Sequence, residues 1–170
     1  MRSIGNWWGN IMSSAGCLRA RCSVLVLGAF VLGAGCARSE VKPEPLAVGQ
    51  ESCAFCRMTV SQPEFASQLL VPGELPKFFD DLGCLHSYLT STTPGPEGGV
   101  IFVMDHHTRA WVRADAAVYT RPPEVATPMA SHLVAHATTN SKDADGVLTG
   151  ATPVPINDVV PATWRSRQER

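Results

Sequence analysis

Residues 78–90 read FFDDLGCLHSYLT, and this stretch predicts how the first half of the domain folds. Its leucines recur at the three- and four-residue spacing of one helix face. An aspartate in front of the first leucine is a residue type that caps helix N-termini with its side chain. We therefore expect a helix that is capped by Asp80 or Asp81 and buries its leucine face. That face consists of Leu82, Leu85 and Leu89.

Segments with the composition of β-strands lie on both sides of this helix. Residues 65–71, FASQLLV, precede it, and residues 100–105, VIFVMD, follow it as a continuous apolar run typical of a buried strand. Residues 110–114 and 131–137 predict two further strands, separated in part by the proline-rich residues 121–129. Two strand–strand–helix patterns in succession predict a small α+β domain.

The N-terminus has the layout of a bacterial lipoprotein signal. Residues 1–21 hold three arginines and no acidic residue, and an apolar run follows that is shorter than the roughly 20 residues of a membrane-spanning helix. LGAGC, residues 32–36, resembles a lipobox, whose cysteine is lipidated and becomes the mature N-terminus. We expect removal of residues 1–35 and lipidation of Cys36. An ordinary signal peptide or an uncleaved anchor is the alternative.

The remaining chain divides by composition into three parts. Residues 36–50 are polar and contain prolines, which predicts a lipidated N-terminus followed by a flexible tether. Residues 51–137 carry the metal-binding motifs, and residues 138–170 are expected to extend the same domain. A net charge of −1 without a basic stripe argues against nucleic-acid binding. No Ser-His-Asp signature or phosphate-binding loop is present, so we expect no enzymatic activity.

Cysteines give the strongest chemical signal. Loss of the signal peptide and lipidation of Cys36 would leave Cys53, Cys56 and Cys84. Three thiols cannot all pair within one exported chain. A free thiol in an oxidising compartment is a liability unless it has a function. Cys84 is expected to be a small buried residue of the helix rather than a third thiolate.

The stretch around the second cysteine predicts a soft-metal site. Residues 56–61, CRMTVS, alternate like a β-strand, in which Cys56 and Met58 would face the same side. A thiolate together with a thioether favours Cu(I) over zinc. Met129, in the irregular TPM segment, would complete a three-sulfur site. Packing in the hydrophobic core is the alternative for both methionines.

Two other functions stay open at this point. A dithiol–disulfide oxidoreductase would use Cys53 and Cys56, although the motif runs into a strand-like pattern and not into the helix that usually lowers a thiolate pKa. A structural zinc site would use the three cysteines and one histidine. The available histidines are His86, His106, His107, His132 and His136.

Four motifs taken together resemble the nitrous-oxide reductase accessory lipoproteins, the NosL family. They are CxxCRMTV, FDDLGCLHSYL, the DHHTRAWVRADAAVY segment and the TPM loop, and the resemblance extends over residues 49–137. It implies two ββαβ units and a Cu(I)-binding protein that is anchored in a bacterial membrane, outer or inner, and faces the periplasm. It also implies delivery of copper to nitrous oxide reductase, or to a related copper enzyme, together with an ABC-type maturation complex in denitrification.

The resemblance also implies a ligand set. Cys56-Arg57-Met58 stands where the family has Cys-Gly-Met, and Met129 stands at the methionine of the TPM loop. Cys53 belongs to a subset of these sequences. The expected metal ligands are therefore Cys53, Cys56, Met58 and Met129, with Cu(I) as the expected ion and zinc as the alternative. Arg57 replaces a glycine, so the backbone at this position decides whether the motif can take the same shape.

Overall fold

The computed structural model describes residues 40–146 and 148–168. The first half contains the short 3-10 helix η1 (Pro63–Phe65), β1 (Ser67–Leu70), β2 (Lys77–Phe79), α1 (Leu82–Ser91), β3 (Val100–Met104) and β4 (Trp111–Arg113). The second half contains β5 (Val118–Arg121), β6 (Val134–His136), α2 (Thr139–Ala144), β7 (Thr152–Val154), the 3-10 helix η2 (Ile156–Asp158) and α3 (Ala162–Gln168).

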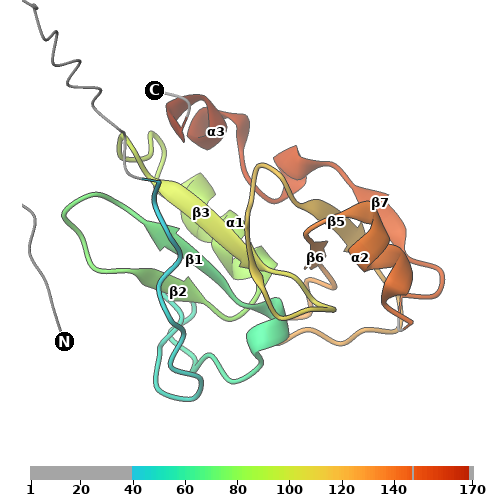
Figure 1. Ribbon diagram of the computed structural model, residues 1–170. Coiled ribbons are helices and arrows are strands. Elements are labelled where there is room, and N and C mark those ends of the chain that lie inside the picture. Colours follow the sequence, from blue (N-terminus) through green and yellow to red (C-terminus); the bar gives the residue numbers. More distant parts are fainter. Residues whose placement is uncertain (1–39, 147, 169–170) are drawn as a thin grey trace, which may run out of the picture. The chain divides into compact units, whose positions relative to one another are not determined.

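The described strands form two antiparallel sheets with the same internal order. The first sheet runs β2-β1-β3-β4 and the second runs β6-β5-β7. In each unit the first strand pairs with the second strand on one side and with the strand after the helix on the other side. Strand β4 extends the first sheet beyond β3. The ββαβ arrangement therefore occurs twice, and the predicted α+β fold is confirmed. The first unit lies to the left in Figure 1 and the second to the right.

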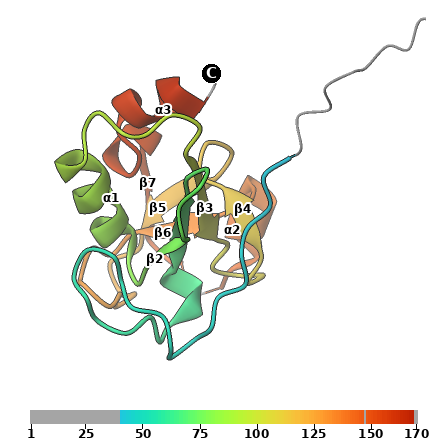
Figure 2. The same cartoon turned by 90° about the vertical axis from the view of Figure 1, so that its left-hand side faces the viewer.

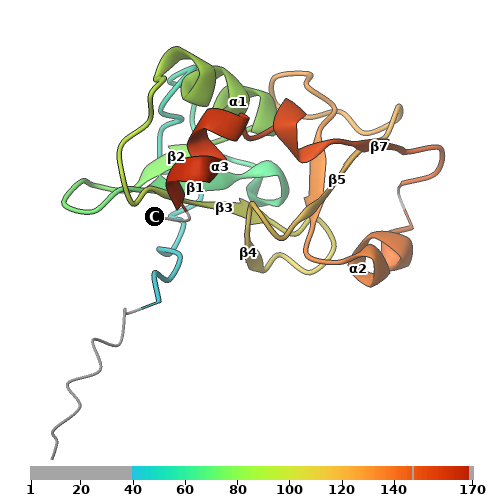
Figure 3. The same ribbon diagram turned by 90° about the horizontal axis from the view of Figure 1, so that it is seen from above.

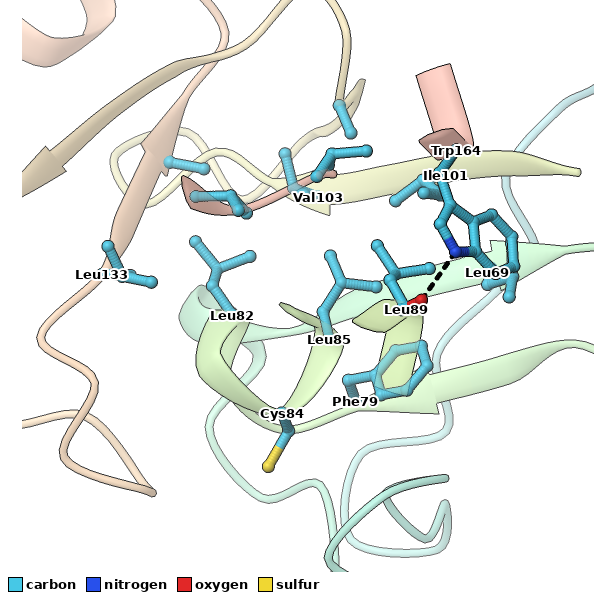
Figure 4. Packing of buried hydrophobic residues seen from close by; sticks show 14 of the residues in the cluster. Leu69, Phe79, Leu82, Cys84, Leu85, Leu89, Ile101, Val103, Leu133 and Trp164 are labelled. Atoms are coloured by element: carbon cyan, nitrogen blue, oxygen red, sulfur yellow. Dashed lines mark hydrogen bonds between the residues drawn. The ribbon is translucent and has the colours of Figure 1, made fainter. Parts of the chain in front are cut away.

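Helix α1 covers one face of the first sheet (Figure 2). Leu82, Leu85 and Leu89 are at most 2 % exposed and pack toward Ile101 and Val103 of β3 (Figure 4). Burying a leucine contributes about 1.5–3 kcal/mol, so this layer is a substantial source of stability in the first unit. The predicted leucine face of the helix is thus confirmed.

The C-terminal helix α3 closes the end of this core. Trp164 is 1 % exposed, and its indole Nε1–H donates to the carbonyl of Leu89, the last buried residue of α1, at 2.8 Å (Figure 4). A Cβ on Gly95 would lie 2.5 Å from the indole ring, so only glycine lets the loop after α1 pass this close. α1 and α3 lie over the first sheet, whereas α2 lies beside the second (Figure 3).

The N-terminal segment joins the domain earlier than Glu51, the boundary expected from the sequence. The Glu44 N–H donates to Oε1 of Gln68 at 2.8 Å, and Nε2 of Gln68 donates to the Glu44 carbonyl at 3.1 Å. The expected signal peptide and the lipidation site Cys36 lie outside the described residues. Among the residues described, no helix has the length and apolar character needed to cross a membrane.

A buried carboxylate links the two ββαβ units. Asp105, which follows β3, is 0 % exposed and accepts the N–H groups of His107 and Thr108 in its own turn. From the second unit it accepts the Ala137 N–H at 2.8 Å and the Ser141 hydroxyl. Burial alone would raise the pKa of Asp105, but these hydrogen bonds outweigh burial and lower the pKa to about 2.

We expect Asp105→Asn to destabilise the domain by about 2 kcal/mol at neutral pH. The lowered pKa means that the folded state stabilises the charged carboxylate over its neutral form by about this free energy. A lowered folded pKa contributes stability above the unfolded value of 3.8, and this contribution is lost as pH falls through 2. Denaturant unfolding at pH 7 and pH 2.5 measures this. The difference between wild type and variant should be smaller at the lower pH. Asp143→Asn, on the exposed side of α2, is the matched control and should change little.

Candidate metal centre

The Cys-x-x-Cys segment forms one tight turn. The Arg57 N–H donates to the Cys53 carbonyl at 3.0 Å, and the Cys53 N–H donates to the Met58 carbonyl at 2.7 Å. Arg57 has φ of 67°, in the left-handed region that glycine adopts most easily. This chain therefore makes, with an arginine, the backbone turn for which a glycine would be the unstrained choice.

The β-strand predicted over residues 56–61 is wrong. The left-handed backbone at Arg57 interrupts the alternation of faces that a strand requires. Within this segment only Thr59 forms a ladder pair, an isolated bridge with Ser52 across the turn. Strand alternation therefore does not explain how the side chains of Cys56 and Met58 are placed.

This turn docks on the end of β2. The Ala54 N–H donates to the Phe78 carbonyl at 2.8 Å, and Cys53 forms a bridge with Phe78 in parallel orientation. Asp80 follows β2 directly, so the docking places the cysteines beside its carboxylate. Cys56 Sγ lies 3.5 Å from both carboxylate oxygens of Asp80.

Four potential ligands converge at this point. The sulfurs of Cys53, Cys56 and Cys84 and a carboxylate oxygen of Asp80 all lie within 4.8 Å of one another. Cys84 is in the first turn of α1, and its sulfur points away from the leucine layer (Figure 4). The N-terminal end of a helix favours negative charge, which suits a thiolate there.

Burial keeps two of the thiols protonated in the metal-free protein. Burial, followed by a hydrogen bond with Asp80, raises the pKa of Cys53 to about 11. Burial, with the nearby Cys53 and Asp80, raises the pKa of Cys84 further still. A metal ion must therefore displace protons from these thiols when it binds. The Cys-x-x-Cys segment is a turn and does not open a helix, so the oxidoreductase alternative lacks the helix N-terminus that usually lowers a thiol pKa.

The cluster opens to solvent on one side. Cys53 and Cys84 are 0 % and 3 % exposed, whereas Cys56 is only partly buried. Met58, two residues after Cys56, is 52 % exposed, and Met129 is 43 % exposed. Neither methionine belongs to the hydrophobic core in this structure, so packing does not account for them.

The loop that carries Met129 is held against the N-terminus of α1. Asp81 caps this helix through Oδ1, as predicted, and its Oδ2 accepts the Met129 N–H at 3.0 Å and the Thr127 hydroxyl at 2.7 Å. Gly83 permits this close approach, because a Cβ there would lie 2.8 Å from Cβ of Ser131. Met129 is thereby fixed beside the helix turn that contains Cys84.

The arrangement suits a metal ion that prefers sulfur. In a tetrahedral site with metal–sulfur bonds of about 2.3 Å, ligand sulfurs lie about 3.8 Å apart. The 4.8 Å limit on the present separations requires only a small contraction. Three thiols and one carboxylate thus form a potential metal-binding cluster, and these ligands alone do not decide between copper and zinc.

The structure brings together some of the residues singled out from the sequence and adds others. Cys53 and Cys56 lie in the cluster, and Met58 and Met129 remain predicted ligands on the exposed side. Asp80 and Asp81 were both predicted as candidates for the helix cap; Asp81 makes the cap, and Asp80 faces the thiols. Cys84, expected to be buried core, is buried but directed into the cluster. The sequence did hold one signal for the position of Cys84: a cap at Asp81 places Cys84 in the first turn of the helix.

No protein-family model matches the chain, and a search of curated proteins found no match either. The resemblance to the NosL family therefore stays a prediction from the motifs.

We expect the three clustered thiols to differ in reactivity. At pH 7.5 in the metal-free protein, iodoacetamide should modify Cys56 at least about tenfold faster than Cys53 or Cys84, because reactivity follows exposure and thiolate fraction. Timed quenching and peptide mass spectrometry give the rate at each site. In denaturant the rates should become similar. Equal rates for Cys53 and Cys56 in the folded protein would contradict the asymmetric burial of the cluster.

Proposed function

We propose that this protein is a Cu(I) carrier that holds its ion at the thiol cluster and transfers it to a copper-accepting enzyme. The observation that carries the proposal is the convergence of the Cys53, Cys56 and Cys84 sulfurs within 4.8 Å of one another. Copper is here the cargo of the protein and not a resident cofactor. The protein itself catalyses no reaction in this proposal.

Ligand softness favours copper over zinc. Thiolates and thioethers are soft donors and select Cu(I), whereas zinc is equally well served by imidazole and carboxylate. Met58 and Met129 are 52 % and 43 % exposed and belong to neither core cluster. In the proposal their thioethers receive the ion at the open edge, and the buried thiols hold it tightly.

Transfer follows from the uneven burial of the ligands. An incoming partner reaches the ion past Cys56, the least buried cysteine, and replaces protein sulfurs one at a time by its own ligands. Each step exchanges one metal–sulfur bond for another, so the ion is never released into water. The buried Cys53 and Cys84 would be the last ligands to dissociate from the ion.

The resemblance described above supplies the cellular setting of this proposal. Lipid on Cys36 would anchor the protein in a bacterial membrane facing the periplasm. The acceptor would be nitrous oxide reductase or a related copper enzyme, reached through an ABC-type maturation complex. These partners come from the motifs and not from the geometry of the cluster.

A structural zinc site is the second candidate. Asp80 favours it, because three thiolates and one carboxylate make a closed four-ligand set of the kind that zinc accepts. In that case the methionines would not affect binding, and removal of zinc would unfold the domain.

Anaerobic Cu(I) titration against a competing Cu(I) chelator tests the carrier proposal. We expect one tightly bound Cu(I) per chain and at least about tenfold weaker binding after Cys56→Ser, Met58→Ala or Met129→Ala, because each change removes a sulfur ligand. Leu75→Ala is the matched control, since Leu75 is an 85 % exposed apolar side chain before β2 and not at its Asp80 end. Unchanged affinity in both methionine variants, with zinc retained instead, would overturn the copper assignment.

Copper affinity should also fall as the pH decreases. The raised pKa of Cys53, about 11, and the still higher pKa of Cys84 mean that both thiols are protonated at neutral pH. Each proton displaced by the metal weakens apparent binding about tenfold per pH unit, so two protons give up to about a hundredfold per unit. Competition titrations at pH 6, 7 and 8 measure the slope. A pH-independent affinity would mean that neither buried thiol binds the ion.

A further inference from the structure

A second group of potential ligands lies at the junction of the two ββαβ units. It consists of His106, which follows β3, His136, which ends β6, and Asp145, which follows α2. Nδ1 of His106 lies 2.5 Å from Oδ2 of Asp145, and Nε2 of His136 lies 3.1 Å from the same oxygen. Two imidazole nitrogens and one carboxylate therefore meet at one point, and no cysteine takes part.

The backbone holds these three side chains in place. The His106 N–H donates to the carbonyl of Ala135, the residue before His136, at 2.9 Å. The ring of Phe65 packs against that of His106 with centroids 5.4 Å apart. Asp145 ends α2, where its N–H donates to the Lys142 carbonyl. Little rearrangement is needed to bring the three ligands onto one ion.

Burial leaves one polar atom of the His136 side chain without a hydrogen-bond partner among the described residues. The ring is 0 % exposed, and this atom is its Nδ1. The ion would bind the other ring nitrogen, Nε2, because that nitrogen faces Asp145.

Charge around the group suits a cation. Asp145 supplies a nearly buried carboxylate, and the charged Asp105 also acts on His136. The oxygens of Asp105 are already occupied by the hydrogen bonds that join the two units, so it contributes charge and not a ligand.

We propose that His106, His136 and Asp145 form a second metal site, for a borderline divalent ion of the Zn²⁺ class, that joins the two ββαβ units. Two imidazoles and one carboxylate are a common ligand set for such ions and leave a fourth position for water. Zinc–ligand bonds of about 2.0–2.2 Å place these atoms about 3.4 Å apart, so binding would separate His106 and Asp145 by about 1 Å. This site shares no residue with the thiol cluster, and it lacks the thiolate and thioether ligands that select Cu(I).

The carboxylate of this group lies next to the surface. A hollow of about 320 Å³ borders Asp145, and neither histidine lines it. An ion that enters from this side would therefore meet Asp145 first.

Long-range ¹⁵N–¹H NMR of the histidine side chains tests the proposal on the full-length chain, with Zn²⁺ as the probe. At saturating Zn²⁺ the side-chain ¹⁵N resonances of Nδ1 of His106 and Nε2 of His136 should move to the range of metal-bound nitrogen, with each ring in one tautomer. The ring nitrogens of His107, their exposed neighbour, should not move and serve as the internal control. If His106 and His136 do not respond to saturating Zn²⁺, the group is a hydrogen-bonded triad only and the proposal is overturned.

Two variants separate this site from the thiol cluster. With Co²⁺ in place of Zn²⁺, cobalt bound by thiolates shows sulfur-to-metal charge-transfer absorption, whereas cobalt bound by imidazole and carboxylate does not. Asp145→Asn should weaken the binding of cobalt by imidazole and carboxylate by at least about a hundredfold and leave the binding of cobalt by thiolates unchanged. His107→Ala should alter neither kind of binding. The proposal would be contradicted if Asp145→Asn removed only the thiolate-bound cobalt, or if the wild-type protein bound no cobalt outside the thiol cluster. Either result is independent of whether the protein carries copper.

Discussion

The carboxylate of Asp81 is the interaction on which the candidate thiol site depends. It is 0 % exposed, and it caps α1 through the Gly83 N–H while it holds the Thr127 hydroxyl and the Met129 N–H. A buried carboxylate is stable only when such donors surround it. By starting the helix at Leu82, Asp81 turns Cys84 toward the Cys-x-x-Cys turn and leaves Asp80 free to face the thiols.

The repeated ββαβ topology gives each unit a comparable place for polar chemistry, but the two units use it differently. In the first unit the junction of β2 with α1 gathers sulfur ligands. In the second, the end of β6 and the residue after α2 gather an imidazole and a carboxylate, with His106 contributed by the first unit. Asp105 ties these parts together, since its hydrogen bonds come from both units.

Local sequence signals predicted the long helix α1 and strand β3, but only some of the short strands. The leucine spacing and the aspartate before it predicted α1, and the apolar run over residues 100–105 predicted β3, because both signals extend over several residues. β2, β5 and β7 have three or four residues each and were missed, because segments this short carry little periodic signal and are strands only through pairing with a neighbour. The segment after Cys56 looked like a strand, but the turn at Arg57 overrides its alternating pattern.

The sequence by itself determined the α+β class, the face of α1 that enters the core and the presence of three thiols in the domain. It also marked Cys53 and Cys56 as a pair, because their spacing is a local property of the chain. Only the tertiary structure decided that Asp80 and Cys84 join them, and that His106, His136 and Asp145 meet at the junction of the units. The reason is physical: residues far apart in the chain become neighbours only when buried strands and helices pack, and no local pattern encodes that distance.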